Sequence, residues 1–414
     1  MGAKRSSVRE YSVITAAYWV FTLTDGALRM LVLLYLHGLG RSPLEIASLF
    51  LFYEFFGVVT NFVGGWLGAR TGLRVTLILG LLFQVLACGL LGALSASLTL
   101  PIVMLAQALS GVAKDLTKMS SKSYIKAVVP AGDSRGLMRW VAWLTGSKNT
   151  LKGVGFFLGG ILLSTWGFRL ACLGMAGIIA VVLVLAWALL PQGVGKASKT
   201  HKLSDMLAGN LRLRWLSAAR LFLFAARDIW FVLALPLYLT SHLNWSHGRV
   251  GAFLAIWVVG YGFVQAASPW YVGARGARKG PNAGRLGAWT LGLLLPLVGL
   301  ALALAWPESG HPVPLLIAGL AIFGIVFATC SAMHSYLVIE YADGDRVSMQ
   351  VGVYYTANAI GRLLGTILSG ALYQGAGEPL RGLVWCLWGA TALVLISGLF
   401  CIPLGRGEAN HARE

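Results

Sequence analysis

Long apolar stretches alternate with short polar ones along almost the whole chain. Each apolar stretch approaches or exceeds the roughly 20 residues with which a helix crosses the hydrocarbon core of a bilayer. The pattern therefore predicts an all-α membrane protein with about twelve transmembrane helices. The predicted ranges are 13–37, 46–68, 74–96, 100–128, 137–162, 168–190, 213–240, 249–272, 286–306, 314–339, 348–373 and 383–404.

The polar segments between these helices are unequally charged. One set of alternate segments, together with both ends of the chain, holds most of the Lys and Arg residues that lie outside the helices. Basic residues collect on the cytoplasmic side of membrane proteins, so we expect both termini to be cytoplasmic. The longest polar stretch, "PQGVGKASKTHKLSDMLAGN", lies in the middle of the chain. It predicts an N-terminal six-helix half (1–190), a basic cytoplasmic linker (191–210) and a C-terminal six-helix half (211–414).

Composition supports this class and excludes others. The 414 residues are 57% hydrophobic and only 12% charged, and the mean hydropathy is +0.75. The net charge of +18 would suggest nucleic acid in a soluble protein, but here cytoplasmic loops account for much of it, so we expect a lipid bilayer and no nucleic acid as partner. The five cysteines form no CxxC pair, and no GxSxG, HExxH or Walker pattern is present. We therefore expect a protein that is not an enzyme and holds no metal and no cofactor. We also expect a monomer.

The two halves resemble each other. "DGALRMLVLLYL" from Asp25 aligns with "DIWFVLALPLYL" from Asp228, and "KSYIKAVVPAGD" aligns with "HSYLVIEYADGD". Gly155 and Gly160 also match Gly365 and Gly370, which places Lys152 against Arg362. Several matches in the same order indicate duplication. A parallel repeat of two six-helix halves is the architecture of major facilitator transporters.

The segment between the second and third helices resembles the G-x-L-x-D-R-x-G-x-R loop of that superfamily. The matching positions are Gly65, Leu67, Arg70, Gly72 and Arg74. Ala69 stands where the acidic residue is expected, so the conformational latch that this acid forms in such proteins is absent or replaced here. In the fifth helix, "GFFLGG" resembles an antiporter motif with Phe156 in place of proline, although its glycines also suit plain helix packing.

A row of lysines lies in the fourth predicted helix. The stretch "GVAKDLTKMSSKSYIK" places Lys114, Lys118, Lys122 and Lys126 four residues apart. Residues four apart share one face of a helix, and this row rises about 18 Å, roughly half of the hydrocarbon core. A base near the bilayer midplane costs roughly 2.5–3.5 kcal/mol, so the row indicates a water-filled cavity or a set of partners.

Two interpretations of the row stay open. Lys126 and Lys122 can snorkel to the cytoplasmic interface, and Lys114 can form a structural pair with an acid. Adjacent residues on a helix point apart, so we expect Asp115 to pair elsewhere than with Lys114. For Lys114 and Lys118 we favour an electropositive path for an anion.

Two further helices supply basic candidates. "TGSKNTLKG" adds two lysines to the fifth helix, and Arg362 takes the equivalent place in the eleventh. Lysine offers a mobile point charge and arginine a planar fork, and both suit phosphate or carboxylate oxygens. The alternative is that some of these side chains point at neighbouring loops. The predicted substrate ligands are Lys114, Lys118, Lys122, Lys148, Asn149, Lys152, Tyr355, Asn358 and Arg362.

Acidic residues and their neighbours are the candidates for coupling or gating. Asp25 and Arg29 lie one turn apart in the first helix, and Arg227 adjoins Asp228 in the seventh. Charge pairs that lock helices explain them as well as proton coupling does. His334 matches the place of Lys122, and an unperturbed histidine titrates near neutral pH, although a lone helical histidine is more often only hydrogen-bonded. The full set is Asp25, Arg29, Glu54, Asp115, Arg227, Asp228 and His334.

Stretches in both halves resemble one family in particular. They are "FTLTDGALRMLVLLYLHGLGRSPLEIASLFLFYEFFGVVTNFVGGWLGARTG", "AQALSGVAKDLTKMSSKSYIK", "LTGSKNTLKGVGFFLGG" and "SAARLFLFAARDIWFVLALP". They are similar to the organoarsenical efflux permeases (ArsJ) of bacterial arsenic-resistance operons. The resemblance implies a multi-pass protein of the bacterial cytoplasmic (inner) membrane that exports 1-arseno-3-phosphoglycerate.

That resemblance also implies a functional link to a glyceraldehyde-3-phosphate dehydrogenase, which attaches arsenate to the glycolytic intermediate. The product carries several negative charges, as the basic candidates require. Three alternatives stay open: an exporter or exchanger of another phosphorylated sugar acid or organic anion, a proton-coupled drug antiporter, and a non-transporting receptor or scaffold. The excess of buried bases argues against cationic drugs.

Overall fold

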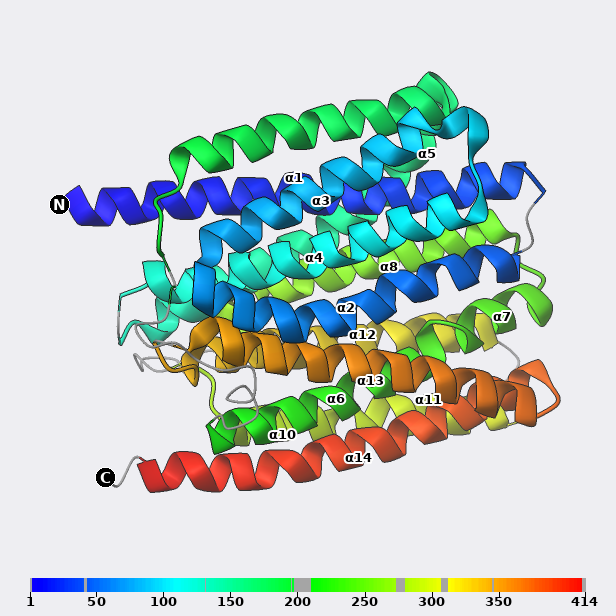
Figure 1. Ribbon diagram of the computed structural model, residues 1–414. Helices are drawn as coiled ribbons and strands as arrows, with labels where there is room; N and C mark the ends of the chain where they lie inside the picture. Colours follow the sequence, from blue (N-terminus) through cyan, green and yellow to red (C-terminus); the bar gives the residue numbers. More distant parts are fainter. Residues whose placement is uncertain are drawn as a thin grey trace. The chain divides into compact units, whose positions relative to one another are not determined.

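The structure is a computed structural model that describes residues 2–40, 43–130, 132–194, 196, 210–272, 280–306, 312–344 and 346–411. Helices make up nearly all of this part of the chain, and it contains no strand. The helices, labelled in Figure 1 where space allows, are α1 (Gly2–Gly38), α2 (Pro43–Thr71), α3 (Leu73–Ala93), α4 (Leu100–Val128), α5 (Ser134–Leu189), α6 (Leu211–Phe231), α7 (Ala234–Ser241), α8 (His247–Ala267), α9 (Pro269–Val272), α10 (Ala283–Gly292), α11 (Leu294–Ala305), α12 (Pro312–Glu340), α13 (Val347–Gly375) and α14 (Pro379–His411).

These helices account for all twelve predicted segments, which confirms the fold class. The range of α5 covers two of them, because Gly167 has a φ of 71° and the chain reverses there. Three other segments are broken near a proline, which lacks the N–H that would bond four residues back. The break between α6 and α7 follows this rule: Pro236 has no N–H to donate to the carbonyl of Val232, and at the start of α7 the N–H of Ala234 donates to the Ser369 hydroxyl at 3.3 Å. Eight of the described helical stretches are long and apolar enough to cross a membrane.

The chain divides into two compact units. The first contains Met1–Gly209 and Ala342–Thr356, and the second contains Asn210–Tyr341 and Ala357–Glu414. The first turns of α13 thus group with the N-terminal helices. The predicted linker, 191–210, lies largely outside the described residues. Each unit is described separately.

Within the first unit, α1 and α5 approach so closely that only glycine fits at two positions of α5. A Cβ on Gly155 would lie 2.5 Å from the carbonyl oxygen of Leu23, and one on Gly159 would lie 2.3 Å from that of Ala27. Small residues allow this backbone contact between helices in lipid. At these two positions of "GFFLGG" the contacts favour the packing interpretation.

The second unit repeats this contact between α6 and α13. A Cβ on Gly365 would lie 2.6 Å from the carbonyl oxygen of Ala225, and one on Gly361 would lie 2.1 Å from that of Leu221. Gly155 and Gly365 were matched by sequence, and each meets a carbonyl of the first helix of its own unit. The same local packing in both units is what a duplication would leave.

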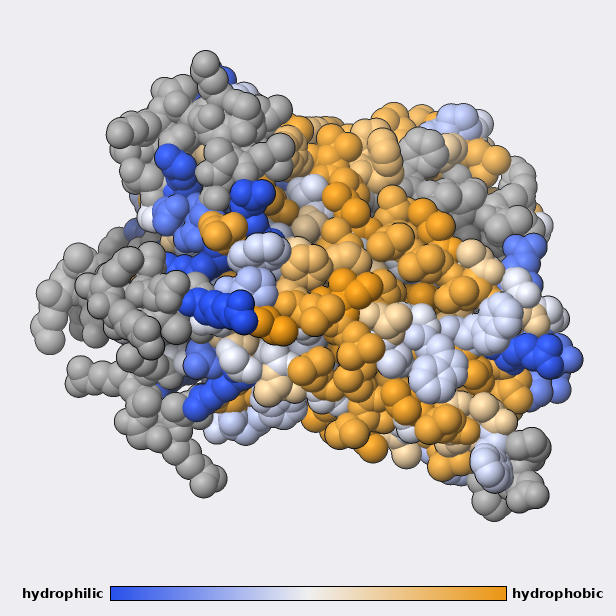
Figure 2. Space-filling view, turned by 90° about the horizontal axis from the view of Figure 1, so that it is seen from below, coloured by the Kyte–Doolittle hydropathy of each residue, from blue (hydrophilic) through white to orange (hydrophobic). Residues whose placement is uncertain are grey.

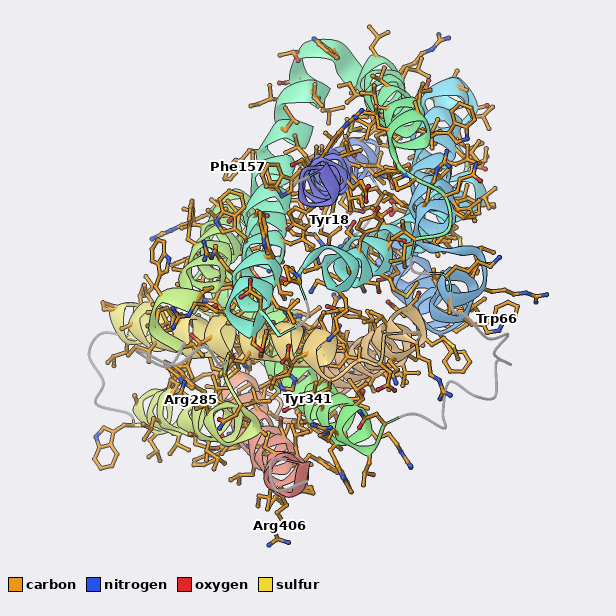
Figure 3. All side chains as sticks on the ribbon, turned by 90° about the vertical axis from the view of Figure 1, so that its left-hand side faces the viewer. Tyr18, Trp66, Phe157, Arg285, Tyr341 and Arg406 are labelled. Carbon is orange, nitrogen blue, oxygen red and sulfur yellow. The ribbon has the colours of Figure 1, made fainter. Side chains whose placement is uncertain are left out.

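Large apolar side chains cover the outside of the helices. Trp187, Ile256 and Leu295 are all well exposed, and on the face drawn in Figure 2 apolar residues fill the middle while hydrophilic residues gather at both ends. Figure 3, viewed nearly along the helices, shows Arg406 pointing away from the end of α14. An apolar middle with polar ends matches the hydrocarbon core and its two interfaces.

Replacing Gly159 with alanine should destabilise the protein, because the new Cβ would meet the backbone oxygen of Ala27. We expect the thermal unfolding midpoint in detergent to fall by an amount equivalent to about 1–3 kcal/mol. Gly177→Ala is the control, since Gly177 lies in the second segment of α5, beyond the reversal at Gly167, and faces open space. Equal midpoints for the two variants would contradict the close packing of α1 and α5.

Candidate substrate-binding site

The lysine row of α4 lies inside the first unit. Lys118 is 8% exposed and Lys122 is 3% exposed, whereas Lys114 and Lys126 are partly buried. The helix is unbroken from Leu100 to Val128, so the four-residue spacing places the row along one face. The long side chains of these lysines therefore lie among packed helices.

Asp115 lies between two of these lysines. Its carboxylate is almost fully buried; Oδ1 forms an ion pair with Lys118, and Oδ2 lies 3.4 Å from the Nζ of Lys114. Asp115 does pair elsewhere, with Lys118, but contrary to expectation it also reaches its neighbour Lys114. Neighbouring Cα–Cβ bonds do diverge, but the flexible four-carbon stem of lysine can bring the ammonium back to the carboxylate.

The opposite helix leaves room for this group. A Cβ on Gly57 of α2 would lie 2.6 Å from the Oδ2 of Asp115 and 3.4 Å from the Nζ of Lys114. The glycine therefore makes space for the carboxylate and the two ammonium groups that share it.

Tyr355 of α13 contacts two lysines of the row, Lys118 and Lys122. The ammonium of Lys118 lies 4.4 Å from the centre of its ring, and that of Lys122 lies 5.0 Å from it. Lys122 also donates a hydrogen bond of 2.5 Å to the Tyr355 hydroxyl. Cations over aromatic faces are attracted by the ring quadrupole, so one tyrosine holds two lysines.

A second polar group joins α1, α2, α3 and α4. The hydroxyl of Tyr53 donates to the Asp25 carboxylate at 2.8 and 3.0 Å, and Ser110 lies 3.4 Å from the same carboxylate and 2.9 Å from Gln84 Oε1. Asp25 is buried, and the Tyr53 ring is fully so. Hydrogen bonds of this kind are what allow a charged carboxylate to stay buried.

The Tyr53 ring connects this group to the lysine row. The guanidinium carbon of Arg29 lies 3.7 Å from its centre, and the ammonium of Lys114 lies 3.9 Å from it. Contacts thus run without a gap from Asp25 through Tyr53 and the Asp115 pair to Tyr355. The side chain of Glu54, another coupling candidate on α2, lies outside the described part.

The α5 candidates are partly buried. Lys148, Asn149 and Lys152 have intermediate exposure, and the neighbouring Ser147 accepts a 2.8 Å hydrogen bond from the indole of Trp19 on α1. A Cβ on Gly26 of α1 would lie 2.7 Å from the carbonyl oxygen of Lys152. These residues therefore lie on the part of α5 that contacts α1.

In the second unit, two arginines share the buried carboxylate of Asp228. The Nε of Arg227 lies 2.6 Å from its Oδ1, and the Nε of Arg362 lies 3.1 Å from its Oδ2. Two bases on one buried acid is the same arrangement as Lys114 and Lys118 on Asp115.

Asn358 and His334 complete the candidates of the second unit. The Oδ1 of Asn358 accepts a 2.9 Å hydrogen bond from Arg220, whose NH1 also lies 3.2 Å from the Ser331 hydroxyl. Arg220 is itself nearly buried, and His334 on α12 is fully buried. The structure thus gives the predicted ligand Asn358 a buried arginine as its partner.

Sequence reasoning missed Tyr53 and Gly57. A tyrosine within the apolar run "FLFYEFF" carries no signal of its own, and a glycine there reads as ordinary helix packing. Their spacing of four residues would have placed both on one face of α2, but which helix they meet depends on tertiary packing.

A family model places this geometry in a known context. The model of the Major Facilitator Superfamily matches residues 14–301 and 216–413. The chain belongs to the Major Facilitator Superfamily. Members of this superfamily are multi-pass membrane transporters of small molecules and are typically not enzymes. The predicted class of protein is thereby confirmed.

Solved structures share the fold at low sequence identity. The human organic anion transporter MFSD10 (TETRAN) has a TM-score of 0.74 and 17% identity, over 95% of this chain and 99% of its own. A bacterial homologue of the iron transporter ferroportin, in an outward-facing state, has a TM-score of 0.74 and 17% identity over 96% and 99%. The E. coli fucose:proton symporter FucP has a TM-score of 0.70 and 14% identity over 96% and 99%. A comparison with curated proteins finds no match.

The superfamily loop of this transporter packs through an apolar contact. Ala69, in the acidic place of the motif, is buried in a small cluster with Met349 of α13, against Phe62, Trp66 and Val353. In Figure 3, Trp66 lies at the periphery of the helices. The acid is thus replaced by an apolar contact to the first turns of α13, inside the same unit.

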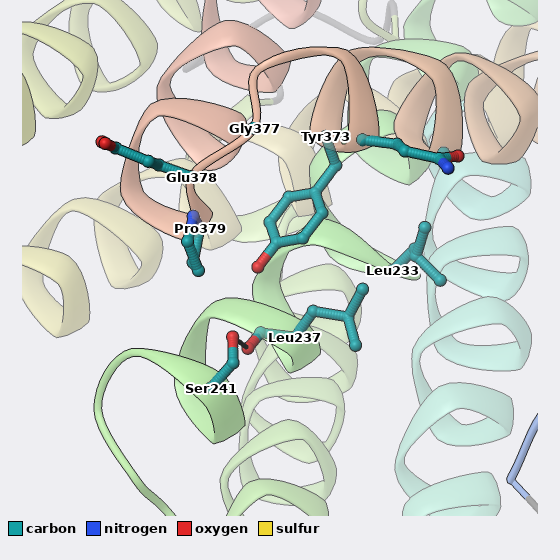
Figure 4. A pocket seen from close by; sticks show the side chains of 9 residues that line it. Leu233, Leu237, Ser241, Tyr373, Gly377, Glu378 and Pro379 are labelled. Atoms are coloured by element: carbon teal, nitrogen blue, oxygen red, sulfur yellow. Dashed lines mark hydrogen bonds between the residues drawn. The ribbon is translucent and has the colours of Figure 1, made fainter.

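A shallow pocket of about 450 Å³ lies elsewhere in the transporter, where α7 meets the turn between α13 and α14 (Figure 4). Its lining residues are Leu233, Leu237, Ser241, Gly370, Tyr373, Gln374, Gly377, Glu378 and Pro379. None of the predicted site residues lines it, so the buried charged groups remain the candidate site.

Tyr53→Phe should destabilise the transporter, because it removes the hydroxyl that donates to the buried Asp25 carboxylate while keeping the ring between Arg29 and Lys114. We expect a loss of about 1–3 kcal/mol, measured as a lower thermal unfolding midpoint in detergent. Tyr35→Phe is the control, because the Tyr35 ring stacks on Phe168 and should tolerate the change within about 0.5 kcal/mol. A Tyr53 variant as stable as the Tyr35 variant would refute a structural role for this hydrogen bond.

Proposed function

We propose that this transporter exports a multiply charged organic anion, and that the anion is 1-arseno-3-phosphoglycerate. The observation that carries the proposal is the buried row of Lys114, Lys118 and Lys122, of which the first two share one carboxylate. Lys122 adds a third buried ammonium group to the row. A guest with several anionic oxygens would suit such a row of ammonium groups.

The cost of burying these bases argues that they serve a function. Removing a charge from water costs several kcal/mol unless a partner compensates it, and each base near the midplane adds roughly 2.5–3.5 kcal/mol to the cost of insertion. A buried ion pair is itself weak support for stability. Intramembrane bases of this kind usually face a substrate pathway. The charge distribution therefore favours an anion over a cation.

The identity of the anion rests on the resemblance to the organoarsenical efflux permeases. Their substrate carries phosphate and arsenate groups on a three-carbon acyl chain, and a glyceraldehyde-3-phosphate dehydrogenase produces it. Ammonium and guanidinium groups suit those oxygens. Pentavalent arsenic bound through oxygen requires no thiolate, which agrees with five buried free cysteines.

The proposed roles divide by unit. In the first, Lys114, Lys118, Lys122, Lys148, Asn149, Lys152 and Tyr355 bind the anion. In the second, Arg362 and Asn358 do so. Coupling or gating is assigned to Asp25, Arg29, Glu54, Asp115, Arg227, Asp228 and His334. Alternating access, the general mechanism of secondary transporters, would move the anion from one side of the membrane to the other.

A second candidate function is export or exchange of an ordinary phosphorylated sugar acid, which the same charges would bind. The human neighbour MFSD10 is by its name an organic anion transporter, but a likeness at 17% identity shows the fold alone. The anion class therefore depends on the lysines and arginines of this chain.

Inverted vesicles separate the two candidates. Vesicles that contain the transporter should accumulate arsenic when supplied with glyceraldehyde-3-phosphate dehydrogenase, NAD⁺ as the oxidant, arsenate and glyceraldehyde 3-phosphate, and should accumulate much less 3-phosphoglycerate. Vesicles without the transporter are the control. Equal uptake of both compounds would support the second candidate, and uptake of neither would refute anion export.

Lys118→Ala and Lys152→Ala should abolish arsenate resistance in cells while the protein still inserts, because each removes one ammonium from the proposed ligands. Western blots of membrane fractions and growth in arsenate measure the two properties. Lys196→Ala is the matched control, because Lys196 is exposed after α5 and lies outside the proposed ligands. Full resistance in both site variants at normal expression would overturn the assignment of these lysines.

A further inference from the structure

Asp115 occupies the place where an anion would bind Lys114 and Lys118. Its carboxylate is 1% exposed, pairs with Lys118 through Oδ1 and lies 3.4 Å from Lys114 through Oδ2. Carboxylate oxygens are acceptors of the same kind as those of a phosphate or an acyl anion. The two lysines therefore already hold a small anion that belongs to the protein.

We infer that Asp115 is a resident counter-ion, which the transported anion displaces from Lys114 and Lys118. The inference rests on the proposed function, because it takes these lysines to be substrate ligands. It adds that Asp115 sets the affinity for the substrate. The substrate must replace the contacts of Asp115 with the two lysines, and this weakens its apparent binding.

The physical reason is the cost of two buried ammonium groups without a counter-charge. In the empty transporter Asp115 reduces that cost, since breaking a buried pair leaves an uncompensated charge. When an anion arrives it takes over the same role. A transport site must bind strongly enough to capture its substrate and weakly enough to release it, and competition from a resident carboxylate achieves the second requirement.

The groups around Lys114 and Lys118 allow both states, the one with Asp115 on the lysines and the one with the transported anion in its place. The ammonium of Lys114 also lies 3.9 Å from the Tyr53 ring centre, and that of Lys118 lies 4.4 Å from the Tyr355 ring centre. These rings attract the lysines independently of Asp115, so the ammonium groups keep a partner when the carboxylate moves. Gly57 adds space beside the carboxylate, because any side chain at this position would begin 2.6 Å from Oδ2.

The test measures binding of 3-phosphoglycerate to the purified full-length transporter in detergent, by isothermal titration calorimetry at fixed ionic strength. Asp115→Asn should lower the Kd about tenfold, because the amide no longer competes as an anion. In vesicles the same variant should transport more slowly, because release of the anion becomes slower. Weaker or unchanged binding by a folded Asp115→Asn protein would show that Asp115 only positions the lysines, and would overturn the inference.

Asp133→Asn is the matched control. It makes the same substitution in the same unit, and asparagine can keep the helix cap that Asp133 provides through its 2.8 Å bond from the N–H of Gly136. Its Kd should equal that of the wild type. A tenfold decrease in this variant too would assign the effect to overall charge and overturn the inference.

Gly57→Ala tests the idea without removing a charge, in case Asp115→Asn does not fold. The added methyl group should push the carboxylate away from its place between the lysines, so the Kd should fall by a smaller factor. An unchanged or higher Kd in this variant, with no folded Asp115→Asn protein, would count against displacement.

Failure of the proposed function looks different. In that case vesicles with the wild-type protein take up neither arsenic nor 3-phosphoglycerate. Wild-type binding that is lost in Lys118→Ala but not tightened in Asp115→Asn would keep the anion site and reject only the counter-ion role.

Discussion

Positive charge buried among helices is the constraint on which the rest of this structure depends. Each unit meets it in the same way: two bases share one buried carboxylate, Lys114 and Lys118 on Asp115 and Arg227 and Arg362 on Asp228. The shared carboxylate lowers the cost of burying both bases. A buried base without any partner would be costly to insert in the membrane.

Close helix packing brings these groups within reach of one another. Gly155 and Gly159 let α5 contact the backbone of α1, and Gly365 lets α13 contact that of α6. In the second unit this contact lies beside Asp228, since a Cβ on Gly365 would lie 3.1 Å from the Cβ of Asp228. The ion pair of Asp228 with Arg362 therefore depends on a helix contact that larger residues would prevent.

Aromatic rings are the third component of the site. Tyr53 lies against Arg29 and Lys114, and Tyr355 lies against Lys118 and Lys122. A ring attracts a cation without neutralising it, so the lysines are held in position and remain available to an anion. Tyr53 also donates to Asp25, which joins a coupling candidate to a proposed ligand through one side chain. Hydrogen bonds and cation–ring contacts thus form one connected network across α1, α2, α4 and the first turns of α13.

The sequence by itself determined the class of protein, the twelve helical segments and the residues whose charge is costly in lipid, because hydropathy, helix period and side-chain charge are local properties. The row on α4 and the match of Gly155 with Gly365 were visible for that reason. Which groups meet was decided only by tertiary structure. The pairing of Asp115 with its own neighbour, the place of Tyr53 between two cations and the space at Gly57 depend on helix rotation and on the reach of flexible side chains, and neither is encoded in spacing along a single helix. The breaks near prolines could have been anticipated from the missing N–H, whereas the reversal at Gly167 required a backbone conformation that the sequence only permits.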